Sequence, residues 1–101
     1  MNTHDKICVI KTLKIIGSKW TILLLRELFE GTKRFGQLQK ALDGISPKTL
    51  SLRLKQLEKD RIIRKKVFAE IPLHVEYSLT QRGQSLSDII KKIKDWGDSR
   101  D

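Results

Sequence analysis

The sequence predicts a mainly α-helical domain with one small β-hairpin, an α+β fold. Apolar residues recur at helical spacing over most of the chain. Residues 62–80 instead form two β-branched and aromatic runs around a turn. The order within residues 34–80 is a short helix, a tight turn, a second helix and the hairpin. This order predicts a winged helix-turn-helix.

The chain has 101 residues, so we expect a single domain over residues 1–101. Hydrophobic residues make up 39% of it, enough for a small core. Within the domain we expect the helix-turn-helix at residues 34–60, the wing hairpin at 62–80, and flanking helices at 6–16 and 81–96.

Glycines follow the first two helices. Residues 6–16 carry apolar side chains at helical spacing, and Gly17 breaks the pattern. Residues 19–30 are apolar nearly all round, which predicts burial on more than one side. Gly31 suits the left-handed position that ends such a helix. A short helix over residues 35–42 follows.

The next helix has the clearest start in the chain. Ser46 can cap its free amides, and Pro47 suits the first helical position because its φ is fixed. At 100° per residue, apolar and cationic residues fall on opposite sides. The apolar side holds Leu50, Leu54 and Leu57; the opposite side holds Lys48, Leu52, Lys55 and Lys59, with Ser51 and Gln56 on its flanks.

Strands and a last helix complete the chain. Residues 62–68 read as the first wing strand, 69–73 as the tip and 74–80 as the second strand, which alternates strictly. Thr80 is expected to cap one helix over residues 81–96. The apolar side of this helix is too large for a small monomer to leave exposed to solvent, so we expect a homodimer. The candidate interface residues are Ile7, Ile10, Leu86, Ile89, Ile90, Ile93 and Trp96.

Most of the excess positive charge lies in one part of the chain. The formal net charge is +9 overall, +2 over residues 1–32, +8 over 33–66 and −1 over 67–101. A polyanion partner needs such a basic region. A basic face kept for solubility is the other interpretation, but solubility gives no reason for charge to collect on the helix-turn-helix and first wing strand.

Composition argues against several classes of protein. A single cysteine cannot form an internal disulfide, which fits a reducing, cytoplasmic location. No apolar run approaches the roughly 18 residues of a membrane span, and the first six residues lack the apolar core of a signal peptide. His4, His74 and Cys8 fail the ligand count and spacing of a zinc site. No catalytic pattern stands out, so we expect no enzyme, metal or cofactor.

Candidate DNA contacts divide into two groups. The N-terminal half of a recognition helix reaches base edges, where Lys and Ser can hydrogen-bond and Leu52 could pack on a thymine methyl, although an exposed Leu is otherwise ordinary. The base-reading candidates are Lys48, Ser51, Leu52 and Lys55. The phosphate candidates are Ser46, Arg53, Lys59, Arg61, Arg64, Lys65 and Lys66. For Arg53 an internal ion pair is the alternative.

Arg61 stands where a helix must become a strand within about one residue. That geometry usually needs a positive φ, which Gly adopts freely and which costs Arg roughly 1 kcal/mol. We therefore expect a left-handed or strained backbone at Arg61. A guanidinium that reaches a DNA phosphate would be a reason to keep Arg there.

Several short motifs occur in a distinctive order between residues 8 and 97. They are Gly17-Ser18-Lys19-Trp20-Thr21, Arg34-Phe35 with Leu38, Ile45-Ser46 with Leu50, Arg53-Leu54 and Leu57, then Arg64, Pro72, Val75-Glu76-Tyr77-Ser78-Leu79-Thr80, Gly83 and Trp96. In these the chain resembles the HxlR family of bacterial transcriptional regulators, a winged-helix group related to the MarR type. The resemblance implies a homodimer, paired through its terminal helices, on a palindromic operator.

Cys8 has two interpretations. As a small hydrophobe on a buried helix side it would be inert. As a thiolate near Lys6 and Lys11 it could be oxidised or alkylated. The resemblance implies that some members sense electrophiles or oxidants through an N-terminal cysteine, often followed by Pro, whereas Val9 stands here. The family usually has Gly at the position of Arg61.

We therefore expect a homodimeric regulator that binds double-stranded DNA, with residues 46–59 in the major groove and residues 64–74 on the backbone or in the minor groove. Its signal would act through Cys8, through an unknown small molecule bound at the dimer interface, or through a partner. One rival is a winged helix that binds proteins without DNA, which the charge partition disfavours. Another is a peripheral membrane binder, disfavoured because the cations span a helix and a hairpin.

Overall fold

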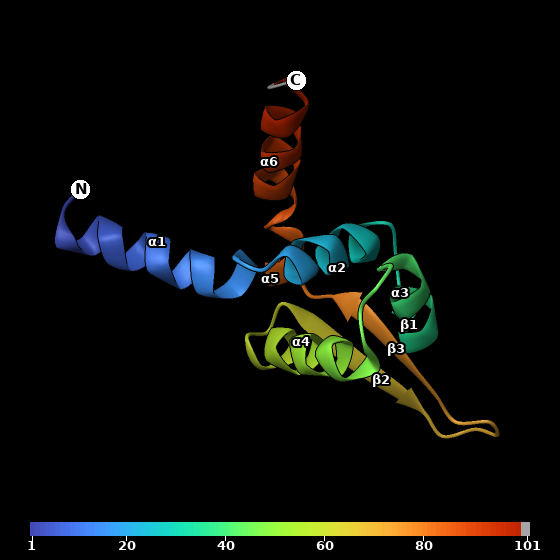
Figure 1. Cartoon of the computed structure of the whole chain (residues 1–101). Coiled ribbons are helices and arrows are strands. Elements are labelled where there is room, and N and C mark those ends of the chain that lie inside the picture. Colours follow the sequence, from blue (N-terminus) through green and yellow to red (C-terminus); the bar gives the residue numbers. More distant parts are fainter. Residues whose placement is uncertain (100–101) are drawn as a thin grey trace.

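The computed structural model describes residues 1–99; residues 100 and 101, the end of the expected domain, lie outside the described part. The expected α+β winged helix-turn-helix class is confirmed. Helices α2, α3 and α4 gather around a small sheet, while α1 and α6 project from it in different directions (Figure 1). The elements are α1 (Thr3–Ile16), α2 (Lys19–Phe29), β1 (Lys33–Arg34), α3 (Phe35–Ala41), α4 (Pro47–Lys59), β2 (Ile63–Phe68), β3 (His74–Leu79), α5 (Gln81–Gln84) and α6 (Ser87–Ser99).

The sheet has three strands, one more than the expected hairpin. Strand β3 is central and pairs antiparallel with β2 on one side and β1 on the other. Tyr77 lies opposite both Lys65 of β2 and Lys33 of β1. Strand β1 is two residues long and has no periodic pattern of its own, because the edge of β3 rather than local sequence defines it.

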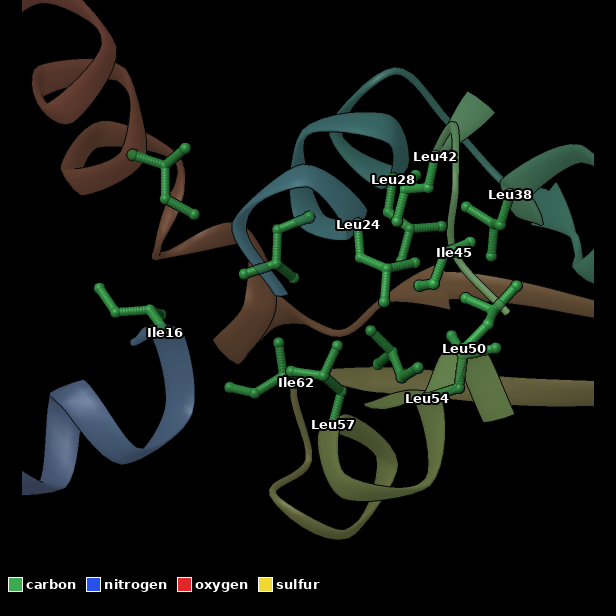
Figure 2. Packing of buried hydrophobic residues seen from close by; sticks show 13 residues of the cluster. Ile16, Leu24, Leu28, Leu38, Leu42, Ile45, Leu50, Leu54, Leu57 and Ile62 are labelled. Carbon is green, nitrogen blue, oxygen red and sulfur yellow. The ribbon is translucent and has the colours of Figure 1, made fainter. Parts of the chain in front are cut away.

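The core lies between α2, α3, α4 and the start of β2 (Figure 2). Leu24 and Leu25 of α2 are fully buried, as the apolar character of that helix predicted. The predicted stripe of α4 is buried against them, with Leu50, Leu54 and Leu57 at most 2% exposed. Burying each such leucine contributes roughly 1.5–3 kcal/mol, which fixes the rotation of α4 about its axis.

The turn after α4 is a Schellman motif. Arg61 has a φ of 62°, so the expected positive φ is confirmed. Arg61 N donates to Glu58 O at 3.0 Å, and Ile62 N donates to Leu57 O at 2.9 Å. Leu57 and Ile62 are both buried, which supplies the apolar contact that usually accompanies these two bonds.

The single helix expected over residues 81–96 is wrong, because α5 and α6 are separate helices. Thr80 caps only α5, where its Oγ1 accepts from Gly83 N at 3.1 Å. The same hydroxyl donates to the carbonyl oxygens of Arg61 and Ile62, which holds α5 against the turn after α4. The chain changes direction at residues 85–86, between the end of α5 and the start of α6 (Figure 1).

The break also changes the role of two predicted interface residues. Ile90 is 3% exposed and belongs to the core of its own protomer, so its assignment to the dimer interface is corrected. Leu86 is partly buried and packs against the same core. Within residues 1–99, no helix combines the length and apolar character needed to cross a bilayer.

Candidate nucleic-acid interface

Helix α4 presents its cationic side to solvent. Its start is fixed as predicted: Ser46 Oγ accepts from Thr49 N at 3.1 Å, and Pro47 is the first helical residue. Since the leucine stripe is buried, the opposite side points outward, and Leu52 is 52% exposed. Lys48, Lys55 and Lys59 are exposed on the same side, with Ser51 half-buried at its edge.

A hollow of about 130 Å³ lies between one flank of α4 and the sheet. Lys55 of α4 and Lys65 of β2 both line it, together with Ser51, Glu58 and Tyr77. Burial, and then the negative charge of Glu58, raises the pKa of Tyr77. The Tyr77 hydroxyl, like that of an ordinary tyrosine, is protonated at neutral pH and can donate a hydrogen bond. The structure thus brings one base-reading candidate and one wing candidate to the same edge.

The wing carries its cations at its base. The strand register places Lys65 opposite Tyr77, while Arg64 and Lys66 project from the other face of the sheet. Arg64, Lys65 and Lys66 are all exposed. The tip is apolar instead: Ile71 is fully exposed and Leu73 is 65% exposed.

Beside the tip, the His74 side chain contacts residues of both wing strands. Its ring stacks on Phe68 with centroids 4.4 Å apart, and Lys66 Nζ lies 4.9 Å from the Phe68 ring centroid. His74 Nδ1 lies 2.5 Å from Glu70 Oε1, and Nε2 lies 3.2 Å from Glu76 Oε2. These contacts fix the shape of the wing between its cationic base and its apolar tip.

Arg53 does not share the exposed face of α4. It lies roughly 120–160° around the helix from the three lysines and is partly buried. Its Nη1 donates to Gln56 Oε1 at 3.1 Å, and its Nε is buried without a partner. No carboxylate of residues 1–99 forms an ion pair with it, so the alternative of an internal ion pair is wrong.

Two further cations lie at element ends. Arg61 is exposed after α4, and its side chain makes no hydrogen bond or ion pair within residues 1–99. Arg34, which sequence reasoning missed, is exposed at the N-cap of α3, where its N donates to Gln37 Oε1 at 2.8 Å. The position of Arg34 directly before the first helix of the motif could have indicated it, because the N-termini of helices favour phosphate groups.

The terminal helices leave apolar side chains in solvent. On α6, Ile89, Ile93 and Trp96 are 43–67% exposed, and Ile7 and Ile10 of α1 are similar. Val9 and Leu13, which were not among the predicted interface residues, are exposed with them.

Cys8 lies on α1 beside these residues and is exposed. Its Sγ is 3.6 Å from His4 Nε2. The interpretation of Cys8 as a buried hydrophobe is therefore wrong for the protomer.

This arrangement, with a fixed helix that presents cations beside a cationic wing, defines a winged helix-turn-helix protein of the DNA-binding class. The family model of the HxlR-like helix-turn-helix matches residues 15–100. The chain belongs to this family, as the motifs indicated.

Relatives and solved structures agree. The HTH-type transcriptional regulator sll1512 of Synechocystis, itself described as uncharacterized, is 50% identical over 95 residues, spanning 89% of this chain and 70% of that protein. YdeP of Bacillus subtilis, described in the same terms, is 44% identical, spanning 86% and 68%. The redox regulator HypR in its oxidized form has a TM-score of 0.86 at 38% identity, covering 90% of this chain and 94% of that one.

The protein is therefore a transcriptional regulator of the helix-turn-helix type and not an enzyme. Nothing in these comparisons supports a winged helix that binds only proteins.

Proposed function

We propose that this regulator binds double-stranded DNA in a sequence-specific way, with α4 in the major groove and the wing on the adjacent backbone or minor groove. The observation that carries the proposal is the division of α4 into a buried leucine side and an exposed lysine side. A helix held this way by its core can enter a groove without repacking.

The side chains take two roles in this proposal. Those on the outward side of α4 read bases, and those at the helix ends and wing base position the protein on phosphates. Arg53 lies on the flank of α4 rather than on its outward side, so it contacts a phosphate only if the DNA backbone reaches that flank. The base-reading residues are Lys48, Ser51, Leu52 and Lys55; the phosphate contacts are Ser46, Lys59, Arg61, Arg64, Lys65 and Lys66, with Arg34 added.

We infer that two copies pair through α1 and α6 and bind a palindromic operator. Support comes from the exposed Ile7, Ile10, Ile89, Ile93 and Trp96 on helices that project from the core. A two-fold dimer places equivalent recognition helices about 34 Å apart, one turn of DNA. Because its target is bacterial DNA, we place the protein in the cytoplasm.

We further propose that Cys8 makes the dimer responsive to oxidants or electrophiles. The thiol is exposed and lies on α1, one residue from Ile7 of the proposed interface. A neighbour of similar fold is described as a redox regulator. A polar adduct at Cys8 would disturb apolar packing between protomers. A small-molecule effector is the alternative signal.

Selection of bound duplexes from random DNA at about 100 mM salt tests the DNA-binding proposal. We expect a palindromic consensus with half-sites one helical turn apart. Lys55→Ala should alter the half-site consensus, whereas Lys91→Ala, an exposed change on α6, should leave it intact. Failure to enrich any sequence would contradict the proposal.

A further inference from the structure

A second hollow lies on the flank of α4 that faces away from the sheet. Its volume is about 280 Å³, and three helices form it. The end of α1 contributes Lys14 and Ile15, the start of α2 contributes Ser18 and Thr21, and the second half of α4 contributes Arg53 and Lys59. The hollow is therefore a joint between a terminal helix and the recognition helix.

The charges around this hollow do not balance. Lys14, Arg53 and Lys59 face one carboxylate, that of Asp60, and none of the four forms an ion pair within residues 1–99. Arg53 is partly buried, yet its hydrogen bond goes to the neutral Gln56 and its Nε has no partner. A guanidinium that is partly removed from water favours a neighbouring anion.

The start of α2 also favours an anion in this hollow. Ser18 is its N-cap but makes no side-chain capping bond, and the first turn holds no acidic residue. The positive end of the α2 dipole is thus left without a compensating charge where Ser18 and Thr21 line the hollow. Both hydroxyls can donate to an oxyanion. Ile15 offers an apolar wall for a small carbon body.

We propose that this hollow binds a small anion through a carboxylate or phosphate group, with Arg53 as its main anchor. The bound group would bridge Lys14 of α1 and Arg53 of α4. Since α1 belongs to the proposed dimer interface, the anion would couple the position of the recognition helix to the pairing of protomers. The anion is either a free small molecule or a phosphate of the operator itself.

Calorimetric titration of the DNA-free protein with benzoate and with inorganic phosphate, at constant ionic strength, tests the site. Wild type and Arg26→Gln should bind one anion per chain with equal affinity, since Arg26 is an exposed arginine of α2 that does not line the hollow. Arg53→Gln should bind at least tenfold more weakly. Arg53→Lys should also bind more weakly, because a lysine keeps the charge but loses the planar fork.

Melting curves establish that each variant folds. If Arg53→Gln does not fold, Lys14→Gln takes its place in the titration. Absence of anion binding by the wild type, or equal affinity in wild type and the Arg53 variants, would overturn the proposal. This titration contains no DNA, so its result does not depend on whether the DNA-binding proposal holds.

Operator DNA distinguishes the two sources of the anion. With a free effector, benzoate should change the DNA affinity of the wild type but not of Arg53→Gln, and the two should bind DNA equally without benzoate. With an operator phosphate in the hollow, Arg53→Gln should weaken binding to all sequences and inorganic phosphate should compete with DNA. Anion binding that leaves DNA affinity unchanged in both arms would overturn the coupling.

Discussion

Arg61 occupies a backbone conformation that suits glycine better than arginine. Its φ of 62° is part of the Schellman motif that ends α4 and starts β2. The Cβ clash there costs roughly 1 kcal/mol. Its exposed side chain has no partner within residues 1–99 that would offset this cost. The strain is therefore local, and a function outside the protomer accounts best for the arginine.

Arg61→Gly should raise the melting temperature slightly while weakening DNA binding. The stability gain is the roughly 1 kcal/mol of relieved strain less the roughly 0.5–1 kcal/mol of entropy that Gly loses on folding. Arg61→Ala is the matched control, since it removes the guanidinium but keeps the strain. A lower melting temperature in Arg61→Gly would refute the strain argument, and unchanged DNA affinity in both variants would refute the phosphate contact.

Gly83 is needed because α5 approaches the turn after α4 closely. A Cβ added at Gly83 would lie 2.1 Å from the carbonyl oxygen of Ile62, a backbone atom that cannot move aside easily. Gly83→Ala should therefore lower the free energy of unfolding by about 1–3 kcal/mol. Gly97→Ala, where nothing lies within 4 Å, should raise it by up to about 1 kcal/mol. Equal effects in urea denaturation would contradict this packing.

At the scale of single elements, α4 was predictable from sequence at both ends. Ser46, Pro47 and the leucine stripe are local signals, and Arg61 stands where a helix must become a strand. Strand β1 and the break between α5 and α6 were not predictable, because β3 and the turn after α4 impose them from a distance.

The candidate nucleic-acid interface was also predictable only in part from the sequence. Periodicity placed the lysines of α4 correctly on its outward side. It could not place Arg53, whose surroundings come from α1 and α2, nor Ile90, which the core of its own protomer covers.

Lys55 of α4 and Lys65 of β2 line the same hollow, but we expect their substitutions to affect DNA binding in different ways. Lys55 faces the groove, so Lys55→Ala should change the relative affinities among operator variants. Lys65 lies on the wing, so Lys65→Ala should lower affinity for all sequences alike and reduce the salt slope by about one unit. Fluorescence anisotropy with a set of single-base operator variants measures both. Sequence-independent effects from both substitutions would show that α4 is not the reading helix.

The whole molecule is elongated, with extents of 53 × 33 × 24 Å. The length comes from α1 and α6, which leave the core and keep apolar side chains exposed (Figure 1). Ile16 and Ile90 pack into the core of the protomer, but the exposed apolar side chains of these helices add nothing to the stability of a monomer. A second copy would cover them and set the spacing of two recognition helices at once.

Ile93→Asp should weaken self-association in sedimentation velocity at micromolar concentration. Ile93 is 44% exposed on α6, and burying a carboxylate in an apolar interface is costly. Ile71→Asp is the matched control, because Ile71 is fully exposed at the wing tip and lies on neither terminal helix. A wild type that sediments as a stable monomer would contradict the dimer.

The central claim is that the charge on residues 33–66, net +8, serves to bind DNA phosphates. The most direct measurement is operator affinity as a function of salt. If a dimer makes about 6–10 phosphate contacts, affinity should fall by roughly 10³–10⁵-fold between about 50 and 200 mM salt. Affinity that stays flat across this range would contradict the claim.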